Sequence, residues 1–408
     1  MNARAEAPAK GGIWRQSRTF EPAARLLFLN QLTINLGFYM LMPYLAAHLA
    51  GDRGAGGLGM AAWAVGLVLG VRNLSQQGMF LVGGALADRF GFKPLIVAGC
   101  ALRTAGFGAL AFAQSLPVLI AASVATGLAG ALFNPAVRAY LAAEAGERRV
   151  EAFALFNTYY QAGILLGPLV GVALTGVSFR LTCVVAAVLF ALLTLVQLRH
   201  LPVRLREEAP ESVEERGQFR TVLTNRTFWL FSLAMTGSYV LSFQVYLALP
   251  LAADGTAATT ALFVVSALVA LAGQLRITAW CKRRLSRERC LVLGLVLMGG
   301  AFLLPVAVPG LVGLLLCAAV LAVANAVLYP YEMDTVVALS GGRWVATHYG
   351  LYNTVCGVGI TLGNLGTGVL LDVTRWSATP WLVLCGVGLG CAGAVRALGR
   401  SGRLGAGG

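Results

Sequence analysis

Two acidic side chains stand in an otherwise apolar stretch, where they could exchange protons. Glu332 and Asp334 occur in the segment YPYEMD. A helix turns by about 200° over two residues, so these carboxylates cannot both face one cavity. Asn325, Tyr329 and Glu332 share one helical stripe. We therefore predict that Glu332 carries a proton within a central pathway, and that Asp334 either takes part in proton coupling or pairs with a nearby arginine. The alternative for both residues is an interfacial pair that touches lipid headgroups.

Two arginines stand in similar apolar surroundings. Arg72 is followed one helical turn later by Gln76 on the same face, and Arg103 lies in the next apolar run. No carboxylate occurs at a matching depth to neutralise either one. Two readings stay open: the guanidinium groups bond to carbonyls and amides, or Arg72 offers its charge to an anionic substrate.

Polar side chains at one-turn spacing in several apolar segments predict a cavity for an amphiphilic small molecule. The alternative for any single one is an ordinary hydrogen bond between helices. The predicted cavity residues are Gln31, Asn35, Tyr39, Arg72, Gln76, Asn134, Asn157, Tyr160, Gln161, Asn325, Tyr329 and Tyr352.

The motifs of an enzyme are missing from the sequence. The three histidines, His48, His200 and His348, are far apart, and neither a Ser–His–Asp set nor a phosphate-cradling loop is present. The eight cysteines are scattered without zinc or redox spacing. We predict no enzymatic activity, no metal and no cofactor.

The composition places these residues in membrane-spanning helices. Apolar residues make up 58% of the 408 residues and charged residues 12%, whereas soluble proteins carry roughly a quarter charged residues. The apolar residues form blocks of about twenty or more, which is the length a helix needs to cross a bilayer. We predict an all-α integral membrane protein surrounded by lipid bilayer. The twelve expected spans are 24–50, 58–87, 93–113, 117–141, 151–176, 179–199, 227–252, 257–280, 289–308, 310–339, 344–372 and 377–398.

The distribution of Lys and Arg predicts how the spans are oriented. Apart from Arg72 and Arg103 inside spans, only Arg53, Arg180 and Arg375 fall on one side, and all the others fall on the opposite side. The positive-inside rule places both termini and the central linker in the cytoplasm. The net charge of +14 then belongs to membrane topology, which argues against nucleic acid as a partner.

Short motifs recur about 195 to 202 residues apart and predict a duplicated architecture. LFNPAV in the fourth span matches LYPYEM in the tenth, and a glycine series in the fifth span has a counterpart in the eleventh. Two halves in parallel repeat are typical of transporters. The expected domains are a cytoplasmic tail 1–23, a six-helix bundle 24–199, a cytoplasmic linker 200–226, a second bundle 227–398 and a cytoplasmic tail 399–408.

A charged turn, GGALADRFGFKP at 83–94, joins the second and third spans. Its order G-x-L-A-D-R-x-G-x-K-P resembles the signature loop of the major facilitator superfamily. The resemblance implies the major facilitator fold, with twelve transmembrane helices in two six-helix halves, and a conformational latch in which Asp88 lies near the start of the eleventh span. A carboxylate at a helix N-terminus gains about 1 kcal/mol. The expected latch residues are Gly84, Asp88, Arg89, Gly91 and Lys93.

The fifth span contains GILLGPLVG, in which glycines repeat every four residues. Gly163, Gly167, Pro168 and Gly171 resemble the G-x-x-x-G-P-x-x-G signature of the antiporter branch; the alternative is an ordinary helix-packing face. The arginine that this branch often carries midway along the fourth span is absent from VATGLAGALFNPAV, and Arg103 is its nearest substitute.

Together these motifs resemble those of bacterial twelve-span drug/proton exporters. The resemblance implies a monomeric secondary transporter in the bacterial cytoplasmic membrane that exchanges protons for amphiphilic drugs or natural products. A metabolite importer or facilitator and a lipid flippase on the same fold are the alternatives.

Overall fold

The computed structural model describes residues 12–50, 54, 57–60, 62–203, 217–253, 255–374 and 378–402. Parts of the expected tails and linker, at 1–11, 204–216 and 403–408, lie outside the described residues, as do Arg53 and Arg375. Every regular element of the described part is a helix, which confirms the predicted all-α class.

The helices follow one another along the chain with short connections. They are α1 (Ile13–Ser17), α2 (Pro22–Tyr39), α3 (Met42–Ala50), α4 (Ala62–Phe90), α5 (Phe92–Phe112), α6 (Leu116–Ala145), η2 (Gly146–Arg148), α7 (Arg149–Thr175), α8 (Phe179–His200), α9 (Gly217–Thr224), α10 (Arg226–Phe243), η3 (Gln244–Tyr246), α11 (Ala248–Ala252), α12 (Gly255–Arg284), α13 (Arg287–Ala301), α14 (Leu304–Ala307), α15 (Leu311–Ser340), α16 (Val345–Thr374) and α17 (Thr379–Arg400).

Eight helical segments of the described part are long and apolar enough to cross a membrane. One of them, Leu116–Thr175, contains both α6 and α7. α4 and α16 are 29 and 30 residues long but are not among the eight; α4 carries Arg72 and several amide side chains along its length. The predicted number of twelve spans therefore stays a prediction.

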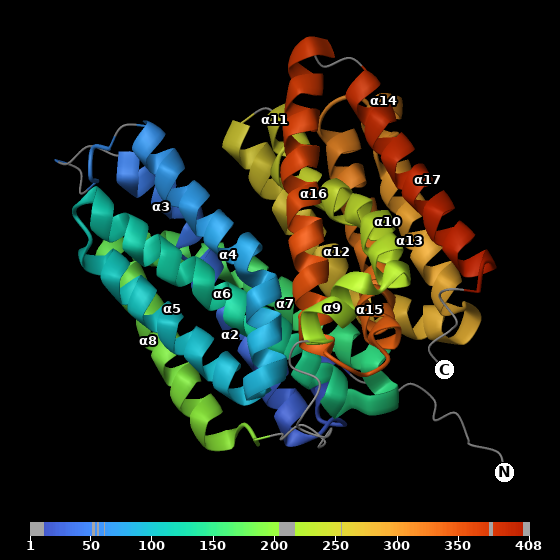
Figure 1. The fold of residues 1–408 in the computed structure, drawn as a ribbon. Helices are drawn as coiled ribbons and strands as arrows, with labels where there is room; N and C mark the ends of the chain where they lie inside the picture. Colours follow the sequence, from blue (N-terminus) through green and yellow to red (C-terminus); the bar gives the residue numbers. More distant parts are fainter. Residues whose placement is uncertain are drawn as a thin grey trace.

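The long helices gather into two groups that meet along a seam (Figure 1). In the first group α2, α4, α5, α6, α7 and α8 pack on one another, and in the second α10, α12, α13, α15, α16 and α17 do so. The seam is formed by α4 against α16 and by α7 against α12 and α15. Buried aliphatic and aromatic side chains from both groups form one continuous hydrophobic core.

The glycine series of α7 brings two backbones into direct contact. A Cβ atom on Gly163 would lie 2.6 Å from the Cβ of Asn35, and one on Gly167 would lie 2.7 Å from the Cβ of Tyr39. At Gly171 it would overlap a backbone carbonyl of the same neighbouring chain segment. Only residues without a side chain allow α2 to pack this closely on α7.

The second group repeats this contact. Gly359 of α16 lies against Thr236 of α10, and a Cβ on Gly363 would lie 2.5 Å from Val240 Cγ1. The contact of α16 with α10 therefore corresponds to that of α7 with α2, as the repeated glycine series predicts.

One helix in each group is interrupted at a similar point. α2 ends at Tyr39 and α3 begins at Met42, while α10 ends at Phe243 and is followed by the short η3 and α11. Interrupted helices of this kind often border the binding sites of transporters.

Gly167→Ala should lower the melting temperature of the detergent-purified protein, because overpacking a close contact costs about 1 to 3 kcal/mol. Gly108→Ala on α5 is the matched control, since a Cβ there meets nothing within 4 Å. A thermal-shift measurement checks both variants. Equal melting temperatures for the two variants and the parent would contradict the close α2–α7 contact.

Candidate functional site

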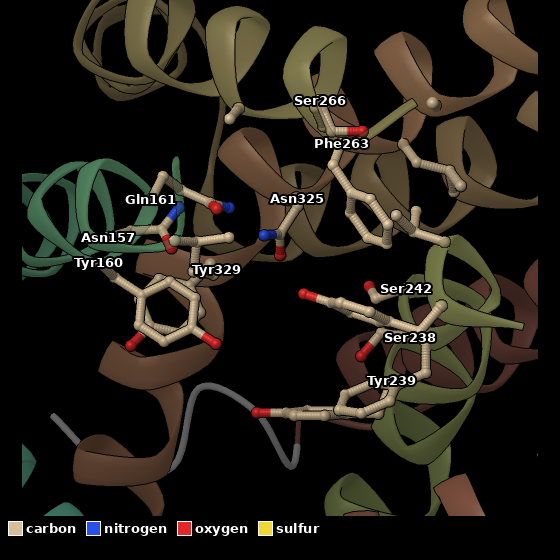
Figure 2. A pocket seen from close by; sticks show the side chains of 18 of the residues that line it. Asn157, Tyr160, Gln161, Ser238, Tyr239, Ser242, Phe263, Ser266, Asn325 and Tyr329 are labelled. Atoms are coloured by element: carbon tan, nitrogen blue, oxygen red, sulfur yellow. The ribbon is translucent and has the colours of Figure 1, made fainter. Parts of the chain in front are cut away.

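A cavity of about 200 Å³ lies between the two helix groups. α6 and α7 line it from the first group, and α10, η3, α12 and α15 line it from the second. Six aromatic rings border it, namely Tyr160, Tyr239, Phe243, Tyr246, Phe263 and Tyr329. Serine hydroxyls and amides stand between these rings (Figure 2). Such a lining suits a ligand that is largely apolar and carries a few polar groups.

Two of the cavity-lining residues carry charges, Glu332 and Arg138. Glu332 of α15 is 2% exposed, and its Oε1 accepts a hydrogen bond from the Tyr352 hydroxyl at 2.5 Å. Within the described part of the chain it forms no ion pair. Arg138 is an electrostatic neighbour of this carboxylate. A buried carboxylate that is hydrogen-bonded to a neutral hydroxyl is well placed to gain or lose a proton as its surroundings change.

Arg138 lines the cavity but is missing from the cavity residues predicted from the sequence, which counted only Arg72 and Arg103 as arginines inside spans. The residue lies in α6, one position after the end of the quoted stretch VATGLAGALFNPAV, and it should have been counted among the ionisable groups inside spans. Its neighbours are the hydroxyls of Tyr329 and Tyr239, and its Nε atom is buried without a partner. Its position inside the predicted span 117–141 was a sufficient signal.

A proline in α15 leads to a chain of hydrogen bonds that crosses the seam beside the cavity. Pro330 has no N–H, so the carbonyl of Ala326 loses its usual helical donor. Gln274 of α12 supplies a replacement through its Nε2 at 3.1 Å, and its Oε1 accepts from Asn157 Nδ2 of α7 at 2.7 Å. A chain of amides thus links the two helix groups beside the cavity.

The structure brings five of the predicted cavity residues together. Asn157, Tyr160, Gln161, Asn325 and Tyr329 all line the cavity, and Figure 2 shows them around one open space. They come from α7 and α15, so the one-turn stripes of these two helices face each other.

The other predicted cavity residues lie outside this lining. They are Gln31, Asn35, Tyr39, Arg72, Gln76, Asn134 and Tyr352. Asn35 and Asn134 donate to backbone carbonyls one turn earlier in their own helices, at 2.7 and 2.8 Å. Tyr352 lies behind the cavity and donates to Glu332. A polar stripe shows only that residues share a helix face, and neighbouring helices decide what that face meets.

Asp88 connects the two groups at the end of α4. Its carboxylate accepts from the backbone N–H groups of Ala346 and Thr347, at 3.2 and 2.6 Å, and from the Thr347 hydroxyl at 2.6 Å. These N–H groups belong to the first turn of α16, where a negative charge is favoured. Gly84 has no side chain and lies directly against the carbonyl of Ala346.

The rest of the charged turn shapes this contact. Gly91 has a φ of 89°, in the left-handed region that favours glycine. Lys93 donates to the carbonyl oxygen of Leu198 at 2.9 Å, near the end of α8. Arg89 stacks on Phe90, with its guanidinium carbon 5.3 Å from the ring centroid.

Asp334 belongs to a second connection between the groups at the same end. We call this connection the Asp334 cluster, and its members are Asp334, Arg149, Arg287, Glu151 and Lys282. The two carboxylate oxygens of Asp334 pair with Arg149 of α7 and Arg287 of α13, each at 2.8 Å, and the residue is 5% exposed. Glu151 of α7 pairs with Lys282 of α12 at 2.5 Å. Of the two readings left open for Asp334, the structure shows the arginine pair.

Comparison with known proteins agrees with this geometry. The Major Facilitator Superfamily profile matches residues 27–283. The chain is 53% identical over 385 residues to an uncharacterised MFS-type transporter of Mycobacterium tuberculosis strain H37Rv, which covers 91% of each chain. It is 30% identical over 372 residues to the multidrug resistance protein MdtH of Salmonella newport, covering 88% of this chain and 89% of the relative.

Solved structures share the fold at low sequence identity. The Escherichia coli fucose:proton symporter FucP aligns with a TM-score of 0.72 at 13% identity, over 92% of this chain and 97% of the symporter. A peptide transporter, POT, aligns with a TM-score of 0.67 at 17% identity, over 97% and 100% of the two chains. The profile match and the relatives together place this chain in the major facilitator superfamily, as a multi-pass membrane transporter.

Proposed function

We propose that this transporter exports amphiphilic small molecules in exchange for protons. The observation that carries the proposal is Glu332, a buried carboxylate in a cavity between two helix groups, bonded to a tyrosine hydroxyl. A charged group in the membrane interior is costly and marks a functional position. Because Glu332 borders the cavity, a ligand there and a proton on Glu332 influence the same conformational equilibrium.

The chemistry of the cavity and the relatives support this substrate class. Aromatic rings, hydroxyls and amides accommodate many amphiphiles without a strict hydrogen-bonding pattern. The relatives of about 30% identity that are named multidrug resistance protein favour efflux over uptake. The antiporter-type glycine series on α7 agrees with the same direction.

Alternating access gives the two interhelical connections a role. Asp88 and the Asp334 cluster hold the two helix groups together at the end of the helix bundle where the basic residues gather. The positive-inside rule assigns this end to the cytoplasm. In this proposal the structure represents a state closed to the cytoplasm, and breaking both connections lets the two groups rock open there.

The remaining expectations form part of the same proposal. The transporter resides in the bacterial cytoplasmic membrane, with both termini in the cytoplasm, and works as a monomer. Protons and a small-molecule substrate are its partners. Glu332 carries the proton, and we assign Asp334 to the connection between the groups.

Glu332→Gln should abolish transport driven by a pH gradient, because an amide cannot carry the proton. In everted vesicles with ethidium as the probe, we expect at least a tenfold lower gradient-driven accumulation, while ethidium still exchanges across the membrane without a gradient. Glu21→Gln, at an exposed position before α2, is the control. Gradient-driven accumulation by Glu332→Gln at the parent rate would rule out this proton carrier, and ethidium expulsion from everted vesicles would favour an importer.

Asp334→Asn should open the cavity towards the cytoplasm, since Arg149 and Arg287 lose their shared carboxylate. Ser266→Cys places a reporter thiol in the cavity wall, and a membrane-impermeant thiol reagent applied to everted vesicles measures its exposure. We expect the labelling rate to rise several-fold in the double variant. Glu147→Gln, which replaces an exposed carboxylate within η2, is the matched control. An unchanged or slower rate with Asp334→Asn would contradict the role of the Asp334 cluster.

A further inference from the structure

Two guanidinium groups meet around one aromatic ring inside the first helix group. The guanidinium carbons of Arg72 on α4 and Arg103 on α5 lie 4.4 and 5.5 Å from the centroid of the Phe38 ring. Arg103 also lies 4.7 Å from the Phe133 ring centroid and 5.4 Å from that of Phe190. Aromatic faces attract cations, but they do not neutralise them.

Both arginines donate hydrogen bonds to neutral oxygen atoms. Arg72 donates to Asn73 Oδ1 at 2.8 Å and to Gln76 Oε1 at 2.9 Å. Arg103 donates to the carbonyl oxygen of Thr126 at 3.3 Å. Neither arginine forms an ion pair with any carboxylate of the described chain, and the Nε atom of each is buried without a partner. Each guanidinium has five N–H donors, so several donors stay available.

A packing role does not account for this arrangement. Arg103 is 3% exposed, and a buried cation in a membrane-spanning helix is expensive. A second cation beside it adds repulsion between like charges. An aliphatic side chain would fill the same volume without either cost. The pair is therefore missing an anion that the chain itself does not supply.

The backbone makes room for this pair. Gly130 of α6 faces it, and a Cβ atom there would lie 2.9 Å from both Arg103 Nη2 and Gln76 Oε1. Phe38 stands one residue before the end of α2, so the helix interruption that follows Tyr39 opens beside the arginines. The Arg72 side chain is only half-buried, which leaves it open to a ligand.

Tyr39 connects the arginines with the cavity. It is an electrostatic neighbour of Arg72. Its hydroxyl also neighbours those of Tyr160 and Tyr246, and both of these residues line the cavity. A ligand with an aromatic body in the cavity can therefore extend an anionic group past Tyr39 towards Arg72.

We propose that Arg72, backed by the charge of Arg103, binds the anionic oxygen group of an amphiphilic ligand. A sulfonate, carboxylate or phosphate has the required charge and can accept two parallel N–H bonds from a guanidinium. Arg72 makes the contact, and Arg103 is a positioning residue that raises the local positive potential. The site concerns binding alone and holds whichever way the ligand is carried.

Two dyes that differ only in a sulfonate test this site on the full-length protein in neutral detergent. Anilinonaphthalene sulfonate carries the anion, and phenylnaphthylamine has the same ring system without it. We expect Arg72→Gln to weaken sulfonate binding about tenfold, as the loss of a charge-assisted hydrogen bond predicts, and to change phenylnaphthylamine binding less than twofold. Arg72→Lys should retain part of the sulfonate affinity. Arg199→Gln, at the exposed end of α8, should change neither dye.

Equal effects of Arg72→Gln on the two dyes, or no effect on either, would overturn the proposal. If this variant does not fold, competition between sodium sulfate and the two dyes on the parent protein tests the same site. At matched ionic strength against chloride, sulfate should displace the sulfonate dye and not the neutral one, and displacement of neither or of both equally refutes the site.

The anionic group can belong to a lipid headgroup or to a soluble ligand, and binding measurements in nanodiscs distinguish these two sources. If a lipid headgroup occupies the site, phosphatidylglycerol should weaken sulfonate binding relative to pure phosphatidylcholine in the parent, but not in Arg72→Gln. If a soluble ligand does, the two lipids should give equal affinities in the parent while the effect of Arg72→Gln persists. Both results support the anion site. A weakening by phosphatidylglycerol of the same size in both proteins would show that the lipid does not act through Arg72.

Discussion

The structure depends on how the few charged side chains among the membrane-spanning helices are stabilised. Lipid offers no solvation to an ion, so each such group must find an opposite charge, a set of neutral donors or acceptors, or a mobile ligand. Asp334 has two arginines, and Asp88 has the N–H groups at the start of α16. Glu332 has a tyrosine hydroxyl, and Arg72 has side-chain amides. These charges thus differ in the type of partner, because Asp334 pairs with opposite charges whereas Glu332 and Arg72 hydrogen-bond to neutral groups.

Charges with strong, fixed partners lie where the two helix groups touch. The Asp88 contact joins α4 to α16, and the Asp334 cluster joins α7 to α12, α13 and α15. Both connections are made of hydrogen bonds and ion pairs and not of interlocked apolar side chains. Water can replace hydrogen bonds and ion pairs of this kind at a small net cost.

Backbone features rather than large side chains position the cavity. The glycine contacts hold α7 against α2 and α16 against α10, and of these four helices α7 and α10 line the cavity. Pro330 frees a carbonyl that draws Gln274, and with it Asn157, into the wall. Glu332 follows Pro330 by two residues on the same helix. The carboxylate of Glu332 and the carbonyl that binds the amide chain therefore belong to one helical segment.

Sequence alone determined the all-helical membrane class, the superfamily, the close-packing glycines and the charged turn, because each is a local property of composition, periodicity or motif order. It also singled out Glu332, since an acidic residue in an apolar block is visible without a structure. Other features depend on how neighbouring helices rotate and approach. One-turn spacing showed that Gln31 and Asn35 share a face, but packing turned that face into α7 and away from the cavity. The same packing brought Arg138 to Glu332 and Arg72 to Arg103, from helices whose mutual rotation no single segment encodes.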